Sequence, residues 1–264
     1  MSTFEPFFSI KKGYGLRATR KIEVGELILE EEPLLLAQSI GNEKLCKVCS
    51  HCLKFVGNVT EQFLKLLVAN EESKQQQDIE NFTKLFGEHV PVENPELPLG
   101  TECDNQCGTI YCSESCKKNA FNNYHKLLCS KPSSSQLIAL HASIQHYKLD
   151  NFVLLEKIYA FLSVDFDANK KIIDSFCLKK WSEIATDTRK ASKIIEELWK
   201  SFKSAIIEDN KLNVGEFATK EKFDELLGML QLNMTSIKVA NPLSTYFYNL
   251  RNSDLSKYQC LLCH

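Results

Sequence analysis

The segment from Cys103 to Cys129 constrains the fold of this chain more than any other, because it concentrates six potential metal ligands. They form three pairs with C-x3-C, C-x3-C and H-x3-C spacing: Cys103 and Cys107, Cys112 and Cys116, His125 and Cys129. A structural zinc site is closed by four tetrahedral thiolate or imidazole ligands, and small domains supply them as near-neighbour pairs. Two such sites need eight ligands, which is two more than this segment supplies.

The missing pair lies upstream, in the sequence CKVCSHC. Both Cys49-x2-Cys52 and Cys46-x2-Cys49 have the spacing of a zinc knuckle. Buried thiols, or disulfides in a secreted chain, are the alternatives for a sequence with 11 cysteines. The start, MSTFEPFFSIKK, has no apolar signal-peptide core, and an odd number of cysteines argues against complete pairing. Eight ligands and two zinc ions are therefore the prediction.

Composition limits the other possibilities. The 264 residues can hold one large domain or two small ones, with 44% hydrophobic and 25% charged residues, as in ordinary globular proteins. No apolar run is long enough to span a bilayer, so we expect a soluble protein of the cytoplasm, the nucleus or both. A net charge of -2 makes nucleic acid an unlikely partner. The lysines around the cysteine pairs are interpreted as a solvated face rather than a DNA-binding patch: Lys117, Lys118, Lys126 and Lys131.

Before the cysteine pairs, the first forty residues are predicted to form β structure. Two strand-like runs flank the turn at Val24-Gly25-Glu26, and the second of them, from Leu27, ends at Pro33. Gly13 and Gly15 lack a Cβ and would let backbone approach a ligand closely, although most G-x-G tripeptides are only turns. Residues 53–102 look like an insertion within the cysteine pattern, with two helical stretches followed by a proline-rich loop.

After the cysteine pairs, the chain is predicted to be helical from Leu137 to about Asn210, and again around Phe217 to Leu230. The large aromatic residues of this region are expected in the core (Trp181, Trp199, Phe202), as is the thiol of Cys177. His141 and His146 are interpreted as structural or exposed. Ile237 and Val239 alternate as in a strand. The terminal Cys260, Cys263 and His264 supply three ligands at most and are interpreted as incidental.

Three motifs, taken together with their order along the chain, resemble those of the SET-and-MYND lysine methyltransferases. In that family a MYND zinc finger interrupts a SET domain. K-G-Y-G-L-R-A at Lys12 to Ala18 is similar to the first cofactor-binding motif of that family. C-S-H-C-L at Cys49 to Leu53, together with the pairs from Cys103 to Cys129, is similar to its finger. LLGMLQLNMTSI at Leu226 to Ile237 is similar to the segment that leads into its catalytic half. A divergent branch of the family has a comparable insertion in the finger.

The resemblance implies an α+β fold with four parts. These are an N-terminal part of a split SET domain (residues 1–45), a MYND finger with its insertion (46–130), a helical insert (131–214) and the start of the C-terminal SET part (215–264). It further implies two interleaved zinc sites: Cys49, Cys52, Cys112 and Cys116 on one ion, and Cys103, Cys107, His125 and Cys129 on the other. Cys46 would then be a spare thiol.

The resemblance also implies S-adenosylmethionine as methyl donor and a lysine side chain of a protein as substrate. The cofactor-binding residues would be Lys12, Gly13, Tyr14, Gly15 and Asn233. The N-H-x-C-x-P-N motif and the later catalytic tyrosine of SET domains do not occur in this sequence, and Tyr246 and Tyr248 come too early to replace that tyrosine. No catalytic residue is therefore assigned, and we expect a chain truncated before the catalytic half and inactive alone. The alternative function is a zinc-finger module that binds proline-containing peptides.

Overall fold

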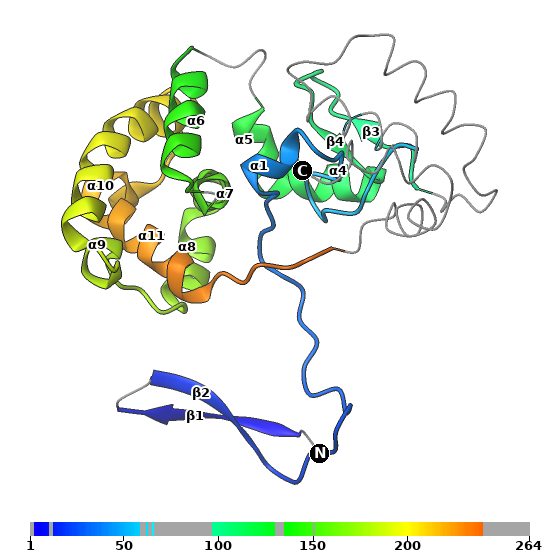
Figure 1. The fold of residues 1–264 in the computed structure, drawn as a ribbon, viewed down its shortest axis with the longest axis vertical. Coiled ribbons are helices and arrows are strands. Elements are labelled where there is room, and N and C mark those ends of the chain that lie inside the picture. The colour runs from blue at the N-terminus through cyan, green and yellow to red at the C-terminus, as the bar shows by residue number, and fades with distance from the viewer. Residues whose placement is uncertain are drawn as a thin grey trace, which may run out of the picture. The chain divides into compact units, whose positions relative to one another are not determined.

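The structure is a computed structural model, and it describes residues 3–10, 13–58, 62, 65, 97–129, 135–149 and 151–239. The chain divides into two compact units, Met1–Leu34 and Leu35–His264. The described residues form helices and two small sheets (Figure 1). This mixture is consistent with the predicted α+β class, whereas the SET-type topology and the division into four domains stay predictions.

The first unit contains a β-hairpin. Strand β1 (Phe4–Ser9) pairs antiparallel with β2 (Gly13–Ala18), and the register places Phe7 opposite Gly15 and Phe8 opposite Tyr14. A Cβ on Gly15 would lie 3.0 Å from Cε1 of Phe7. A larger side chain at residue 15 would therefore require the Phe7 ring to move by a few tenths of an ångström.

Two predicted strands are wrong. The run from Leu27 to Pro33 follows the expected turn, where Gly25 has a φ of +88°, but forms no strand. Residues 234–239, with Ile237 and Val239, are likewise outside any strand. Alternating apolar residues become a strand only where a neighbouring strand pairs with their backbone groups, and in the described part of the chain none does so at either segment.

The described helices all lie in the second unit, and the predicted helical region is confirmed except for the break between α8 and α9. Its elements after the cysteine pairs are α6 (Ser135–Tyr147), α7 (Asn151–Val164), α8 (Phe166–Asp174), α9 (Trp181–Ile184), α10 (Thr188–Phe202), a π-helical turn η2 (Lys203–Glu208), a 3₁₀ turn η3 (Gly215–Ala218) and α11 (Lys220–Asn233). No helix among the described residues has the length and the apolar character needed to cross a membrane.

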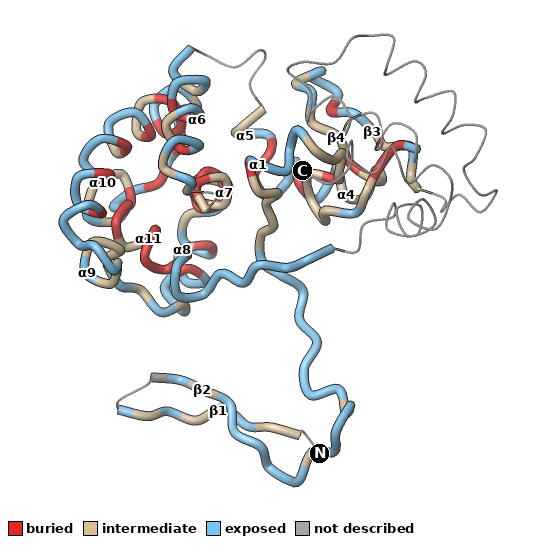
Figure 2. Tube along the Cα trace, viewed as in Figure 1, coloured by how far each residue is buried: buried red, intermediate tan, exposed pale blue. Residues whose placement is uncertain are grey.

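Helix α10 illustrates why these segments are helical. Asp187 caps its start by accepting a hydrogen bond from the amide of Lys190 at 2.9 Å. Its buried residues recur at helical spacing on one face: Ala191, Ile194, Ile195, Leu198 and Phe202. This face packs into the larger of the two cores that the described residues form (Figure 2).

Aromatic rings fill the centre of that core. Phe202 lies 5.1 Å, centroid to centroid, from both Tyr159 and Phe223, and Phe152 lies 5.8 Å from Phe223. Trp181 and Trp199 pack against this core while remaining partly exposed. Cys177, by contrast, is exposed rather than buried, because it lies in the segment between α8 and α9 and not on a helix face.

The cysteine pairs belong to a smaller part of the second unit. It contains α1 (Ile40–Glu43), the paired strands β3 (Thr101–Glu102) and β4 (Ile110–Tyr111), α4 (Glu114–Ala120), a π-helical turn η1 (Phe121–His125) and α5 (Lys126–Leu128). A second apolar core forms here around Val56, Tyr111, Ala120 and Tyr124. Ala160 of α7 also belongs to it, so α7 contributes to both cores.

Several predictions concern residues outside the described ranges. They involve the two helical stretches of the insertion except Gln62 and Lys65, most of the proline-rich loop, Lys12, Lys131, Tyr246, Tyr248, Cys260, Cys263 and His264.

Candidate metal centres

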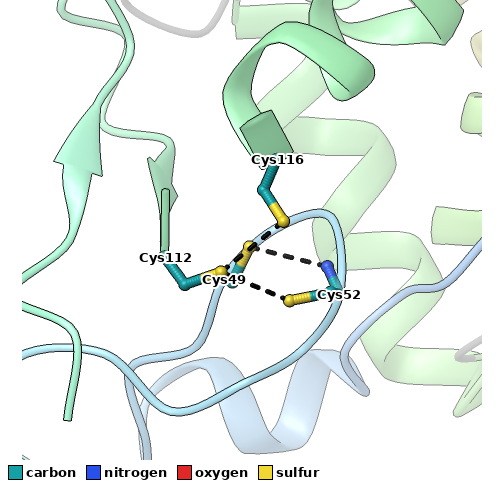
Figure 3. Close-up of side chains that lie close together, drawn as sticks. All are labelled: Cys49, Cys52, Cys112 and Cys116. Carbon is teal, nitrogen blue, oxygen red and sulfur yellow. Dashed lines mark hydrogen bonds between the residues drawn. The ribbon is translucent and has the colours of Figure 1, made fainter. Parts of the chain in front are cut away.

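Cys49, Cys52, Cys112 and Cys116 form the first group of potential metal ligands. Their ligand atoms all lie within 4.8 Å of one another. Cys112 Sγ is 3.5 Å from the Sγ atoms of both Cys52 and Cys116 (Figure 3). The four side chains, drawn from a loop, a strand end and a helix start, converge on one point.

Local structure explains how these residues are positioned. The loop that carries Cys49 and Cys52 is closed by backbone hydrogen bonds from Cys49 to Lys54 and from Leu53 to Cys49, and Leu53 has a positive φ of 61°. Cys112 directly follows β4. Cys116 lies in the first turn of α4, where its amide donates to the N-cap hydroxyl of Ser113 at 3.2 Å. The sequence C-S-E-S-C thus joins a strand end to a capped helix start.

Cys103, Cys107, His125 and Cys129 form the second group, also within 4.8 Å of one another. His125 Nε2 lies 3.2 Å from Cys103 Sγ and 3.5 Å from Cys107 Sγ, and Cys103 Sγ lies 3.6 Å from Cys129 Sγ. The first pair comes from the turn between β3 and β4, where Gly108 has a φ of +85°. The second pair comes from η1 and the end of α5, one helical turn apart.

These distances fit tetrahedral zinc. With Zn–S bonds of about 2.3 Å and Zn–N bonds of about 2.0 Å, tetrahedral angles place two sulfurs about 3.8 Å apart and a sulfur and a nitrogen about 3.5 Å apart. The observed separations of 3.2 to 3.6 Å are near these values. They are too long for disulfides, and all of these cysteines are free. The donor set of seven thiols and one imidazole is the one zinc prefers.

At some of these positions the surroundings favour the protonation state that binds metal, which is the thiolate for cysteine and the neutral imidazole for histidine. Burial raises the pKa of Cys49, but hydrogen bonds from backbone amides, first that of Cys52, outweigh it and lower the pKa overall. At Cys107, hydrogen bonds with the side chain and the backbone of Thr109 likewise outweigh burial and lower the pKa. Burial, assisted by Lys157, lowers the pKa of His125, which favours the neutral imidazole that binds metal. Burial raises the pKa of Cys129 to about 11, so metal binding there must displace a proton.

Cys46 stands apart from both groups. Its sulfur lies 3.1 Å from Gln38 Nε2, which donates to it, and burial raises the pKa of the thiol. Of the two spacings that the sequence left open, the geometry therefore joins Cys49 with Cys52.

The described lysines near the finger do not form a patch of unpaired positive charge. Lys117 forms ion pairs with Asp104 and Glu114.

Three residues around the metal ligands were not singled out from the sequence. Tyr124 precedes the ligand His125, and its hydroxyl donates to the carbonyl of Ser50, between the first two cysteines, at 3.2 Å. Tyr111 packs edge-on against the ring of His125 at 5.8 Å. Lys157 reaches the same Ser50 carbonyl from α7. Tyr111 and Tyr124 adjoin ligands in the sequence, which could have drawn attention to them, whereas nothing in the sequence marks Lys157.

The predicted cofactor residues belong to different units of the chain. Gly13, Tyr14 and Gly15 lie in β2, where the side chain of Tyr14 is exposed. Asn233 ends α11 in the other unit, and its side-chain amide donates to the carbonyls of Cys177 and Met229. The assignment of these residues to a cofactor site stays a prediction.

The sequence of this chain is similar to those of curated lysine methyltransferases. A curated relative, the protein-lysine N-trimethyltransferase SMYD5 of Homo sapiens, is 28% identical over 193 residues, which cover 67% of this chain and 42% of that protein. SMYD5 of Gallus gallus is 30% identical over 128 residues, covering 48% and 27%. The histone-lysine N-methyltransferase ATXR2 of Arabidopsis thaliana is 28% identical over 188 residues, covering 56% and 40%.

The chain thus aligns with less than half of the length of each of these relatives. No family model and no solved structure matches the chain. The curated relatives are lysine methyltransferases of the SET/SMYD family, which confirms the resemblance of this chain to that family.

Proposed function

We propose that this chain is part of the machinery of an S-adenosylmethionine-dependent protein-lysine methyltransferase, and that its finger binds two zinc ions. The observation that carries the proposal is the gathering of eight cysteine and histidine side chains into two tetrahedral-sized groups, in a chain whose relatives are lysine methyltransferases. Closed four-ligand sites such as these hold structural rather than catalytic zinc. Bound zinc would tie residues 49–52 to residues 112–116, and residues 103–107 to residues 125–129, and so stabilise the finger.

The reaction proposed is transfer of a methyl group from the sulfonium of S-adenosylmethionine to the neutral ε-amine of a lysine in a protein substrate. Such chemistry depends on positioning and on removal of water more than on acid-base groups. We assign cofactor contact to Lys12, Gly13, Tyr14, Gly15 and Asn233 on the family resemblance alone. The cytoplasm or nucleus, where protein substrates with lysine side chains are plentiful, is the proposed location.

Two measurements test the function. The protein isolated from its source cells is incubated with tritiated S-adenosylmethionine and cell proteins, and methyl-lysine is identified by mass spectrometry; the 264-residue chain, expected to show no turnover alone, is assayed in parallel. The name given to each relative favours this enzyme over a peptide-binding module. If the isolated protein transfers no label to lysine, the methyltransferase proposal fails.

Calorimetric titration of S-adenosylmethionine into the zinc-loaded chain tests the cofactor residues separately. Tyr14→Ala is expected to weaken binding about 10-fold, the effect of losing roughly 1.4 kcal/mol of contact. Val24→Ala is the matched control, because Val24 is also a large, exposed side chain of the same unit. Equal affinities for the two variants would remove Tyr14 from the proposed site.

A further inference from the structure

Lys157 of α7 connects the helical part of the second unit to the finger. Its ammonium donates to the carbonyl oxygen of Leu36 at 2.6 Å and to that of Ser50 at 2.9 Å. It also lies 4.9 Å from the centre of the Tyr124 ring, within the range of a cation–π contact. Ser50 lies between Cys49 and Cys52, so Lys157 holds the backbone of the first metal-ligand pair.

Helix α7 contributes residues to both apolar cores of the second unit. Phe152, Leu155 and Tyr159 of this helix are fully buried in the large aromatic core, while Ala160 is buried in the core of the finger. The helix also packs along η1, the segment that carries His125. Any change in how the finger holds Lys157 is therefore transmitted to a helix on which the main core depends.

Lys157 has no direct negative partner among the residues that the structure describes. Part of the residue is accessible, but its ammonium end is enclosed, and burial lowers the pKa of Lys157 to about 8 against the opposing influence of Cys49, Glu156 and Glu43. Among the described residues, no carboxylate forms an ion pair with it; its contacts are two carbonyls and one aromatic ring. A buried cation without a compensating anion is costly.

Metal binding would supply the missing charge. Four neutral thiols carry no charge, whereas four thiolates around one Zn²⁺ carry two more negative charges than positive ones. This excess negative charge would arise at Cys49, Cys52, Cys112 and Cys116. Lys157 is hydrogen-bonded to the carbonyl of Ser50, in the loop that carries the first two of these cysteines.

We propose that Lys157 is the counter-cation of the all-cysteine zinc site, so that loading this site with zinc strengthens the attachment of α7 to the finger. The finger then acts as a metal-dependent latch on the helical core. This inference rests on the zinc sites proposed above and is independent of methyl transfer.

Tyr124 also contributes to the contact between Lys157 and the loop that carries Cys49 and Cys52. Its ring lies beside the ammonium and its hydroxyl donates to the same Ser50 carbonyl, while its neighbour His125 belongs to the second metal group. Second-layer contacts of this kind orient metal ligands, and their loss commonly lowers metal affinity 10- to 100-fold.

The test replaces Lys157 by glutamine, which keeps hydrogen-bond donors for the two carbonyls but removes the charge. Zinc is titrated against a competing chelator, and Cys112→Ser and Cys129→Ser assign each binding phase to its group. Lys157→Gln is expected to weaken the all-cysteine site about 10-fold and to leave the histidine-containing site closer to normal. Lys157→Arg should retain the affinity, and Lys193→Gln, which removes an exposed lysine of α10, is the charge-matched control.

Hydrogen exchange of the α7 amides gives a second readout, because coupling between zinc and α7 must be reciprocal. In the wild-type chain, zinc is expected to slow exchange in α7, and Lys157→Gln should reduce this protection. The wild-type comparison needs no variant and stands even if a variant fails to fold. Unchanged α7 exchange on zinc binding, or equal zinc affinity in Lys157→Gln and Lys193→Gln, would overturn the latch. A chain that binds zinc as proposed but shows either result leaves the zinc sites themselves intact.

Discussion

Gly228 of α11 lies against the backbone carbonyl of Lys179 so closely that a Cβ at residue 228 would be 1.8 Å from the carbonyl oxygen. It would also be 2.8 Å from the backbone nitrogen of Trp181. The atoms it would meet are backbone and cannot rotate away, unlike the end of a flexible side chain. Only glycine therefore permits the segment that leads into α9 to pack directly on α11.

Gly228→Ala is expected to destabilise the chain by about 3 kcal/mol, because overpacking against backbone forces the two elements apart. The measurement is urea unfolding followed by circular dichroism. Gly41→Ala is the control, since a Cβ at Gly41 of α1 would meet only the Ser39 hydroxyl at 3.9 Å; this change should be neutral or slightly stabilising. Similar midpoints for both variants would contradict the close approach.

Asp224 of α11 is buried and holds the start of α9. Its carboxylate accepts a hydrogen bond from the amide of Ser182 at 2.9 Å and another from the Ser182 hydroxyl. Asp224→Ala is expected to cost about 2 kcal/mol of unfolding free energy, because the amide loses a charged acceptor. Ser182→Ala removes only the hydroxyl and should cost about 1 kcal/mol. Equal losses for both would show that the bond to the amide contributes nothing measurable.

The sequence predicted those features whose determinants are close together in the chain. Each cysteine or histidine pair has its own local spacing, so the ligands of the finger could be proposed without knowledge of the fold. The helices could be predicted for the same reason, because the apolar face of α10 recurs every three or four residues.

Features that depend on distant residues were missed. Lys157 and Ser50 are 107 positions apart, and no spacing rule relates them. The strand predicted after Gly25 failed because an alternating pattern cannot say whether a partner strand lies beside it. Cys177 was expected to be buried because the apolar pattern around it was read as a continuous helix, whereas α8 ends at Asp174.

Zinc content distinguishes the cysteines of the finger from the neighbouring thiol. Cys112→Ser is expected to lower the zinc bound per chain from two ions to one, because a closed site that loses one of its four ligands holds zinc poorly. Cys46→Ser should keep both ions, because the Cys46 thiol lies outside both groups and is held by Gln38. Metal analysis of the dialysed proteins measures both. Loss of an ion in Cys46→Ser would show that Cys46, and not Cys52, completes the first pair.

His141 of α6 and Glu156 of α7 predict a pH dependence of stability. His141 Nε2 lies 2.9 Å from Glu156 Oε1, and this hydrogen bond raises the pKa of His141 above its ordinary value, against the effect of burial. Because folding favours the protonated imidazole, the stabilisation is fully present below about pH 6.5 and is lost as the pH rises through the raised pKa. The His141 side chain is 43% exposed, so solvent screening limits the effect to about 1 kcal/mol or less.

The expected result is that His141→Gln destabilises the zinc-saturated chain more at pH 6 than at pH 9, as measured by urea unfolding at both values. His146→Gln is the control, because His146 lies on the same helix with an exposed side chain that contacts Tyr147. Comparing variants at the same pH and the same zinc saturation removes the effect of protons on the metal ligands, since that effect is common to all three proteins. A loss in His141→Gln that is equal at the two pH values would mean that the pair acts as a neutral hydrogen bond, with no net preference of the folded chain for the imidazolium.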